Sequence, residues 1–334
     1  MKPLSATHQK ILEFCNMLPA CCEPFLLATG TESALTTRLA YARELVWFFD
    51  YLINYNPEFC ELERPSIELN DIKKITSQDI SRYLTILKDQ GLAERTLARK
   101  RAALSSFFAY LSNNQQIPFN PVLAASKVKI HQSDEVIHLT MEEQDILLNA
   151  IANGTGLDNN KLKYHDKYKK RDSALVMLFL DTGMRISELH AIDIIDVDLN
   201  GCSVIVTRKG GNHQHIYFSD TARDLLEEYI EERKLHGPVL SSAPLFVTLQ
   251  NKRLAVRSIE VLVKKYVQAA LPGKGNTIHV HTLRSSFAMA FYEASGKDLL
   301  SLQRKLGHKS LAATNIYAKA TDKAMYNSRS LLRP

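Results

Sequence analysis

Several polar residues stand in the second half of the chain where packing alone would not require them. Arg185 follows Gly183, at which an apolar helical pattern ends, and Glu188 lies three residues further on. At that spacing Arg185 and Glu188 can share one face of the next helix. Lys209 stands in a glycine-rich turn, which lets the backbone approach a ligand closely. Each residue also has an ordinary explanation, as a helix cap, a solvated turn residue or a surface charge.

Two further motifs combine histidine with arginine or tyrosine. In "HVHTLRSSF", His281 and Arg284 stand three residues apart at the start of an apolar helical pattern. Free backbone N–H groups and the helix dipole favour an anion at such a place. In "LGHKSLAATNIY", His308 follows a glycine turn and Tyr317 comes nine residues later in a predicted helix. Taken alone, Tyr317 is better explained as a packing aromatic.

Together these side chains would provide the groups for transesterification at a phosphodiester. The two arginines can bind the non-bridging oxygens and match the extra negative charge of the pentavalent transition state. The lysine can protonate the leaving 5′-oxygen, while the histidines handle the proton of the nucleophile. A tyrosine hydroxyl, with an ordinary pKa of about 10, can act as nucleophile in such a cationic pocket and form a phosphotyrosine. No metal site is predicted, because the nearby histidine pairs have no third ligand at metal-binding spacing.

The first third of the chain predicts helices that carry clusters of basic residues. Apolar stripes indicate helices over 36–55, 77–91 and 94–111, and Thr76 with Asp79 forms the capping pattern of the second. In the first of these helices the stripe includes Trp47. A phosphate-binding surface and a solvated helix face both explain the basic residues, which are Arg38, Arg43, Arg95, Arg99, Lys100 and Arg101.

The rest of the chain predicts a second, mixed domain. Residues 202–218 alternate in polarity and break at a glycine turn, which indicates two antiparallel strands, and helices follow on both sides. We expect a mainly α protein, with an N-terminal helical domain (1–125), a linker (126–139) and a mostly α domain with a small antiparallel sheet (140–334).

Composition indicates a soluble intracellular protein. Among 334 residues, 45% are hydrophobic and 23% are charged, and the net charge of +6 weakly favours a polyanionic partner. The five cysteines are odd in number and form no CxxC pair, which favours reduced thiols. No apolar run approaches the length of a membrane span. We therefore expect a cytoplasmic protein with no membrane partner.

The order of these motifs resembles the tyrosine recombinases, the integrase and Xer group. "TGMRISEL", "HTLRSSFAMAF" and "LGHKSLAATNIY" are similar to the three catalytic boxes of that family. Residues 140–320 resemble its catalytic domain, and roughly residues 24–125 resemble its SAM-like core-binding domain. Two departures stand out: Ser285 occupies a position where the family often has histidine, and the hairpin "RKGGNHQHI" has a longer turn than usual.

The resemblance implies a role for each site residue. Arg185 and Arg284 would clamp the phosphate, Lys209 would be the general acid, and Tyr317 would be the nucleophile. The remaining catalytic positions are His281 and His308, which would handle protons, and Glu188, which would support the site. The resemblance further implies that neither metal nor ATP is needed, because the phosphotyrosine conserves the energy of the cleaved bond.

The resemblance also implies a biological reaction on double-stranded DNA, and hence a nucleoid-associated protein. Four protomers, monomeric or dimeric when free, would synapse two sites and exchange strands through 3′-phosphotyrosine intermediates and a Holliday junction. Both dimer resolution and mobile-element integration or excision fit. The C-terminal tail, with Leu331 and Leu332, would pack on a neighbouring protomer by analogy. The basic segment 161–171 is explained equally well as a DNA contact or as a solvated insertion.

Three other activities remain as alternatives. A type IB topoisomerase uses the same chemistry to relax supercoils, but its members resemble this chain much less in the LGH box. A non-catalytic DNA-binding relative would make Tyr317 dispensable. A metal-dependent nuclease would be sensitive to chelators.

Overall fold

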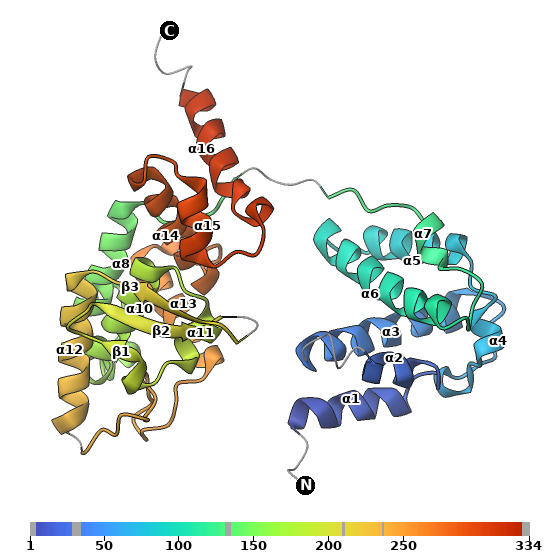
Figure 1. Cartoon of the computed structure of the whole chain (residues 1–334), viewed down its shortest axis with the longest axis horizontal. Coiled ribbons are helices and arrows are strands. Elements are labelled where there is room, and N and C mark those ends of the chain that lie inside the picture. The colour runs from blue at the N-terminus through green and yellow to red at the C-terminus, as the bar shows by residue number, and fades with distance from the viewer. Residues whose placement is uncertain (1–4, 29–34, 131–134, 209–210, 236, 329–334) are drawn as a thin grey trace. The chain divides into compact units, whose positions relative to one another are not determined.

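The computed structural model describes residues 5–28, 35–130, 135–208, 211–235 and 237–328 (Figure 1). The chain divides into two compact units, Met1–Gln132 and Ser133–Pro334, and this division falls within the segment expected to link the domains. Lys209, Leu331 and Leu332, for which roles are expected, lie outside the described residues. Within the described ranges, no helix is both long and apolar enough to cross a membrane.

The first unit is built from helices. Its elements are α1 (Ala6–Asn16), α2 (Cys22–Ala28), α3 (Leu35–Tyr55), the 3-10 turn η1 (Arg64–Ser66), α4 (Leu69–Ile72), α5 (Ser77–Asp89), α6 (Glu94–Asn113) and α7 (Pro121–Ala124). The three helices expected here correspond to α3, α5 and α6. Helix α5 begins where its cap predicts, because the Thr76 side chain accepts a hydrogen bond from the Asp79 backbone N–H (3.3 Å).

Aromatic side chains fill the core of the first unit where α3 meets α6. Phe48 and Phe49 on α3 and Phe107 and Phe108 on α6 are fully buried and contact one another ring to ring. Trp47 was expected in the same apolar stripe but is 55% exposed, because the buried face of α3 is the one that carries Phe48.

The second unit combines helices with a small sheet. Its elements are α8 (Met141–Asn153), α9 (Asn159–Leu162), η2 (His165–Lys167), α10 (Lys169–Thr182), α11 (Ile186–Ala191), η3 (Ile194–Asp196), β1 (Val197–Asp198), β2 (Ser203–Thr207), β3 (His213–Tyr217), α12 (Asp220–Leu235), α13 (Val256–Ala270), η4 (Pro272–Lys274), α14 (Val280–Ala294), α15 (Leu299–Leu306), η5 (Leu311–Ala313) and α16 (Asn315–Ser328).

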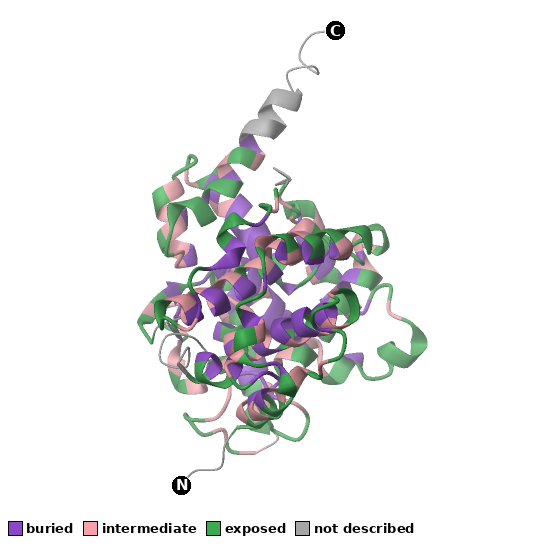
Figure 2. Cartoon of the chain, turned by 90° about the vertical axis from the view of Figure 1, so that its right-hand side faces the viewer, coloured by how far each residue is buried: buried purple, intermediate pink, exposed green. Residues whose placement is uncertain are grey.

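Helix α10 forms the centre of this unit, where Leu175, Leu178 and Phe179 are completely buried. Helices α8, α12 and α14 pack around it. The strands lie in the order β1-β2-β3, all antiparallel, and β2 and β3 form the expected hairpin. Buried residues lie along the inward faces of the helices, and exposed residues lie on their outer faces and in the loops (Figure 2). The expected fold class is confirmed.

The basic segment 161–171 forms α9, η2 and the start of α10, and several of its charges are paired locally. Arg171 Nη2 lies 2.7 Å from Asp172 Oδ1, and the Asp172 side chain is completely buried. Tyr266 donates a hydrogen bond to the other Asp172 oxygen (3.0 Å), which ties α13 to α10. Arg171 therefore serves the fold, because losing it would leave a buried carboxylate without its closest cation.

Candidate active site

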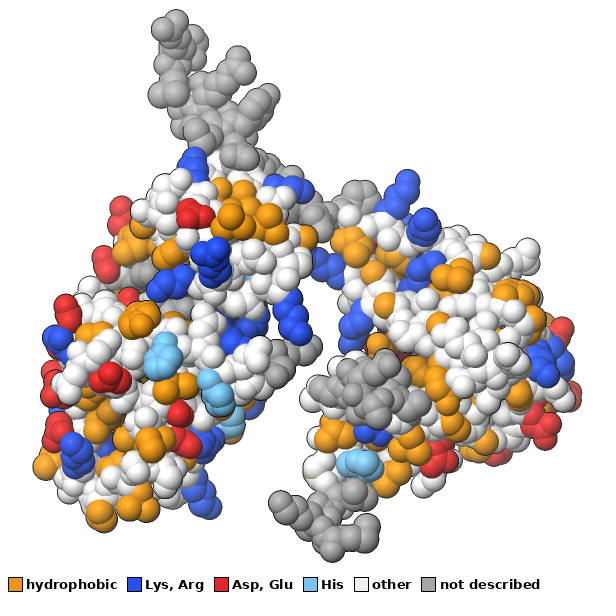
Figure 3. Space-filling model, viewed as in Figure 1, with side chains coloured by type: hydrophobic (Ala, Val, Ile, Leu, Met, Phe, Trp, Pro, Cys, Tyr) orange, Lys and Arg blue, Asp and Glu red, His pale blue; other side chains and the backbone are white. Residues whose placement is uncertain are grey.

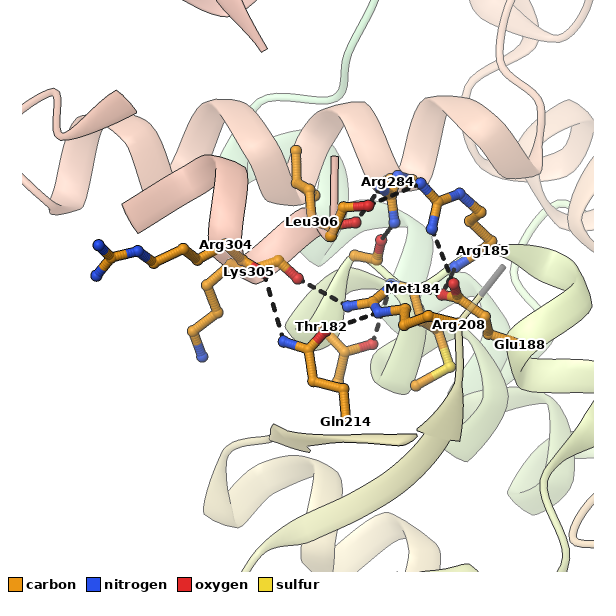
Figure 4. Close-up of polar contacts among 12 residues, drawn as sticks. Thr182, Met184, Arg185, Glu188, Arg208, Gln214, Arg284, Arg304, Lys305 and Leu306 are labelled. Atoms are coloured by element: carbon orange, nitrogen blue, oxygen red, sulfur yellow. Dashed lines mark hydrogen bonds and ion pairs between the residues drawn. The ribbon is translucent and has the colours of Figure 1, made fainter. Parts of the chain in front are cut away.

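The C-terminal end of α15 gathers three arginines. A helix leaves its last carbonyls without partners inside the helix, and the helix dipole favours positive charge there. The carbonyls from 304 to 307 accept hydrogen bonds in turn: Gln214 Nε2 donates to Arg304 O (3.4 Å), Arg208 Nη2 to Lys305 O (2.9 Å), Arg284 Nη2 to Leu306 O (2.7 Å) and Arg185 Nη2 to Gly307 O (3.4 Å). Figure 4 shows the guanidinium groups turned toward this helix end.

Glu188 holds two of these arginines from the other side. Its Oε1 accepts from Arg185 Nη1 (2.9 Å), and its Oε2 accepts from Arg208 Nη1 (2.8 Å) and from the Arg185 backbone N–H (2.7 Å). Burial alone would raise the pKa of Glu188, but the Arg185 amide and the charge of Arg208 lower it below its ordinary value. Glu188 is therefore an ionised carboxylate that fixes both arginines.

Arg284 joins α14 to the ends of two other helices. Its side chain is only 2% exposed, and it donates to Gly183 O at the end of α10 and to Leu306 O at the end of α15. Gly183 has a positive φ of 57°, and a Cβ there would lie 2.2 Å from the Phe287 ring. Glycine is thus required both for the turn and for the packing beside Arg284. Burial, followed by the charge of Arg185, lowers the pKa of Arg284 to about 10, so it remains a cation at neutral pH.

Both histidines of the site are neutral near pH 7. His308 Nδ1 lies 2.9 Å from Thr314 Oγ1, and Thr314 is completely buried. Burial and then the charges of Arg284 and Arg185 lower the pKa of His308 to about 4. The same three causes lower the pKa of His281. A neutral imidazole beside a cationic cluster can accept a proton, and a bound phosphate would favour that protonation.

This environment makes the stability of the protein depend on pH. An unfolded histidine takes up a proton near pH 6.5, whereas folded His308 takes one up only at about pH 4. The unfolded state then binds more protons, so the free energy of unfolding should fall as pH decreases through this window. Thermal unfolding at a series of pH values should show that stability falls less steeply with decreasing pH for His308→Asn than for the wild type. Parallel curves would contradict the cause given for the shift.

Tyr317 is a core residue whose hydroxyl lies near the arginine cluster. It lies near the start of α16, is 2% exposed and packs in a cluster that includes Phe287, Tyr292 and Leu306. Burial raises the pKa of its hydroxyl, and a hydrogen bond with Ser285 and the charge of Arg284 oppose that rise. The two explanations considered for Tyr317 are therefore compatible, because the ring packs while the hydroxyl lies beside Ser285 and within the field of Arg284.

An open cleft of about 1090 Å³ lies over the arginine cluster, and its lining includes Arg185, Arg208 and His308. Arg284 and Tyr317 lie buried beside it. The structure thus brings together Arg185, Glu188, Arg284 and His308 as expected, and it adds Arg208. Val204 and Val206 on β2 are buried, and so is Arg208, which directly follows the strand. The two-residue period of the strand, continued by one step, could therefore have indicated that Arg208 points inward.

The six basic residues of the first unit separate into two groups. Arg43, Arg95 and Arg99 are exposed on α3 and α6. The other three have partners within the chain: Arg38 Nε donates to Leu26 O (2.6 Å), Lys100 Nζ to Glu44 Oε2 (2.5 Å) and Arg101 Nη2 to Val122 O (2.7 Å). Arg38 and Lys100 are less than a tenth exposed. For Arg38 and Lys100 the expected role as surface phosphate ligands is corrected to a structural role, because both side chains are buried and donate hydrogen bonds inside the domain.

Comparison with known families decides the assignment. The profile described as "Phage integrase family" matches residues 139–324, and "Phage integrase, N-terminal SAM-like domain" matches residues 26–115. The chain belongs to the phage integrase family. It is thus a tyrosine recombinase, an enzyme that transfers DNA strands, and the expected resemblance to that family is confirmed.

Tyrosine recombinases of the Xer type are similar over most of the chain. Tyrosine recombinase XerC of Caldanaerobacter subterraneus subsp. tengcongensis is 30% identical, with 94% of this chain and 87% of that protein covered. XerC of Roseiflexus sp. is 30% identical, with coverages of 88% and 87%.

Solved structures share the fold. XerH site-specific recombinase bound to a palindromic difH substrate, in a post-cleavage complex, has a TM-score of 0.70 at 23% identity, with 90% of this chain and 81% of that chain covered. The Tn1549 transposon integrase in complex with a circular-intermediate DNA has a TM-score of 0.64 at 19% identity, with coverages of 92% and 98%.

Proposed function

We propose that this tyrosine recombinase cleaves and rejoins specific duplex DNA sites with Tyr317 as the nucleophile. The observation that carries the proposal is the convergence of Arg185, Arg284, neutral His308 and Tyr317 at the end of α15, within the catalytic domain of the family. These residues supply anion binding, proton acceptance and a nucleophile in one place.

The proposed cleavage step is a single displacement at phosphorus. The Tyr317 oxygen attacks, its proton passes to neutral His308, and the bond from phosphorus to the 5′-oxygen breaks. Lys209 protonates that leaving oxygen, which becomes a free 5′-hydroxyl, while the 3′-phosphate remains on Tyr317. Rejoining is the reverse attack by a 5′-hydroxyl, so the step requires no external energy source.

The arginines would stabilise the transition state more strongly than they stabilise the DNA bound before the reaction. Attack on phosphorus adds negative charge to the non-bridging oxygens, and fixed guanidinium donors are already in place to receive it. Arg185 is held by Glu188 and still leaves 36% of its side chain exposed toward a ligand. Arg284 is held more rigidly by two backbone carbonyls. A preorganised pair of this kind costs little rearrangement during the reaction.

The first unit would add affinity for the DNA backbone through the exposed cations of α3 and α6. Lys and Arg side chains lie along α6 in the first unit (Figure 3). Arg99 Nη2 lies 2.9 Å from Glu44 Oε1, and Lys100 Nζ lies 4.5 Å from the centre of the exposed Trp47 ring. These contacts orient Arg99 and Trp47 on one surface, which suits a phosphate and an adjacent sugar or base.

Arg95→Ala should reduce the salt dependence of DNA binding. Each phosphate contact contributes a slope of about 0.9 in log affinity against log salt concentration. Arg95 is exposed on α6, and Lys73, exposed near α4, provides a control that removes the same charge elsewhere on the unit. Binding of a labelled duplex at several salt concentrations should give a lower slope for Arg95→Ala than for Lys73→Ala. Equal slopes would exclude the proposed surface.

Covalent capture tests the proposed activity and identifies the DNA site in the same experiment. The full chain is incubated with a randomised duplex library that carries nicks, in the presence of a chelator, and denaturant-resistant adducts are isolated. We expect an enriched DNA sequence attached through a 3′-phosphate to the peptide that contains Tyr317. Failure to capture any DNA, or attachment to a different peptide, would refute the proposal. Capture that requires a divalent metal would favour a nuclease.

Recombination requires synapsis, which the captured sequence makes testable. We propose that four protomers join two such sites through a Holliday junction. A lambda integrase tetramer bound to a Holliday junction shares the fold, with a TM-score of 0.64. A plasmid with two captured sites should yield recombinant circles and a complex of the mass of a tetramer. Relaxation of a one-site plasmid without recombinant products would favour the topoisomerase alternative.

A further inference from the structure

Arg208 connects three parts of the catalytic domain that are distant in sequence. Its Nη1 donates to Glu188 Oε2 (2.8 Å), its Nε to Gln214 Oε1 (2.8 Å) and its Nη2 to Lys305 O (2.9 Å). These partners belong to α11, β3 and α15. The side chain is 9% exposed, so its contacts are largely shielded from water. Arg208 therefore has a fixed position rather than a solvated one.

The residues around Arg208 close the base of the β2–β3 hairpin. The Arg208 backbone N–H donates to Asn212 O (2.8 Å), and the Gly211 N–H donates to Arg208 O (3.0 Å). Across the strands Thr207 pairs with His213, directly before this closure. Lys209 directly follows Arg208 in the sequence, so the contacts of Arg208 fix the described residue that precedes Lys209.

The shape of this contact requires arginine. One planar guanidinium donates in three directions to a carboxylate, an amide oxygen and a backbone carbonyl, which a lysine ammonium at the end of a flexible chain cannot reproduce. Gly307 allows the close approach, because a Cβ at that position would lie 2.9 Å from Arg208 Nε. Gly307, the glycine of the LGH motif, therefore allows both the turn after α15 and the close packing of the Arg208 side chain.

Arg208 also shares Glu188 with Arg185. Glu188 Oε1 accepts from the Arg185 side chain, and Oε2 accepts from the Arg208 side chain. A shift of Arg208 would therefore remove a donor from Oε2. Arg185 would still keep its own bonds to Glu188 Oε1 and, through its backbone amide, to Oε2. Replacing Arg208 should therefore disturb the position of the hairpin more than the position of Arg185 in the phosphate clamp.

We infer that Arg208 is a positioning residue, which anchors the hairpin to Glu188 and to the end of α15 so that Lys209 reaches the leaving 5′-oxygen. The inference rests on the proposed function, in which Lys209 is the general acid. Arg208 itself donates no proton to the DNA. Its loss should slow cleavage through the acid step and leave DNA binding nearly unchanged.

A substrate with a sulfur leaving group distinguishes an effect of Arg208 on the general-acid step from a general structural effect. Two nicked duplexes of the captured sequence are prepared, with oxygen or sulfur bridging the scissile phosphorus and the 5′-carbon. A thiolate leaves without protonation, so sulfur removes the need for a general acid. On the oxygen duplex, Arg208→Lys should cleave about 10- to 100-fold more slowly than wild type. On the sulfur duplex, its rate should return close to that of wild type.

Companion variants make every outcome decisive. Lys209→Ala defines the pattern for a missing acid, and His215→Gln, on the exposed side of β3, should cleave like wild type on both duplexes. If Arg208→Lys does not fold, Gln214→Ala, which removes one acceptor of Arg208, should show a smaller defect of the same kind. A folded Arg208 or Gln214 variant that stays slow on sulfur overturns the inference. If Lys209→Ala also stays slow on the sulfur duplex, both the inference and the role of Lys209 as general acid are overturned. Covalent capture of DNA by the wild type would still support the proposed function.

Discussion

Tyr317→Phe is expected to abolish the covalent protein–DNA adduct. Removing the proposed nucleophile should lower the cleavage rate by more than about 10⁴-fold, because no other group can form the phosphotyrosine. The captured duplex, incubated with the variant and separated under denaturing conditions, provides the measurement. DNA binding should persist, since the surfaces proposed to hold the backbone are unchanged.

The structure predicts that this variant folds normally. The ring of Tyr317 packs against Phe287 and Tyr292, and phenylalanine preserves that packing. Only the hydroxyl beside Ser285 is lost, which should change the free energy of unfolding by about 1 kcal/mol. Tyr292→Phe removes a hydroxyl from the same cluster and should cleave normally. An adduct that still forms with Tyr317→Phe would show that the nucleophile has been assigned wrongly.

Arg284→Lys is expected to produce the second largest loss. A fixed donor to developing charge contributes about 10²- to 10³-fold in rate, and lysine cannot reproduce the bidentate geometry. Cleavage of the captured duplex should fall by that factor, whereas its dissociation constant should change little. A large change in affinity with an unchanged cleavage rate would instead make Arg284 a ground-state contact.

Arg284→Lys should also lower stability. The arginine spans the carbonyls of Gly183 and Leu306, and lysine can satisfy only one of these buried acceptors well. An unsatisfied buried carbonyl costs about 1–3 kcal/mol in the free energy of unfolding. Arg223→Lys, on the exposed surface of α12, is the matched control and should change neither stability nor cleavage. Denaturant unfolding of the two variants beside wild type measures the difference.

Local patterns predicted the elements of the fold well. The Thr76 capping box, with Asp79 three residues on, marks the start of α5. Alternation around a glycine turn predicted the β2–β3 hairpin. These features depend on neighbours within a few residues, so a single sequence contains them. Motif order and spacing were likewise sufficient to predict the family.

Side-chain partners could not be predicted in the same way. Lys100 looked like a surface cation, but it meets Glu44 in the core, 56 residues earlier in the chain. Arg208 stands directly before a glycine turn in the sequence, and its guanidinium group donates to the carbonyl of Lys305, 97 residues later. Such pairs arise when helices and strands pack, and nothing in the local sequence specifies them.

The sequence by itself determined the family, the order of the elements and the chemical types of the site residues. The tertiary structure decided how those residues act together. The free carbonyls at the end of α15 and the ionised Glu188 bind the guanidinium groups of Arg185, at the start of α11, Arg208, just after β2, and Arg284 on α14. Burial beside these groups keeps His308 neutral. Tyr317 is placed by apolar packing on α14 and α15. Hydrogen bonding and burial act through space, so only the folded chain defines them.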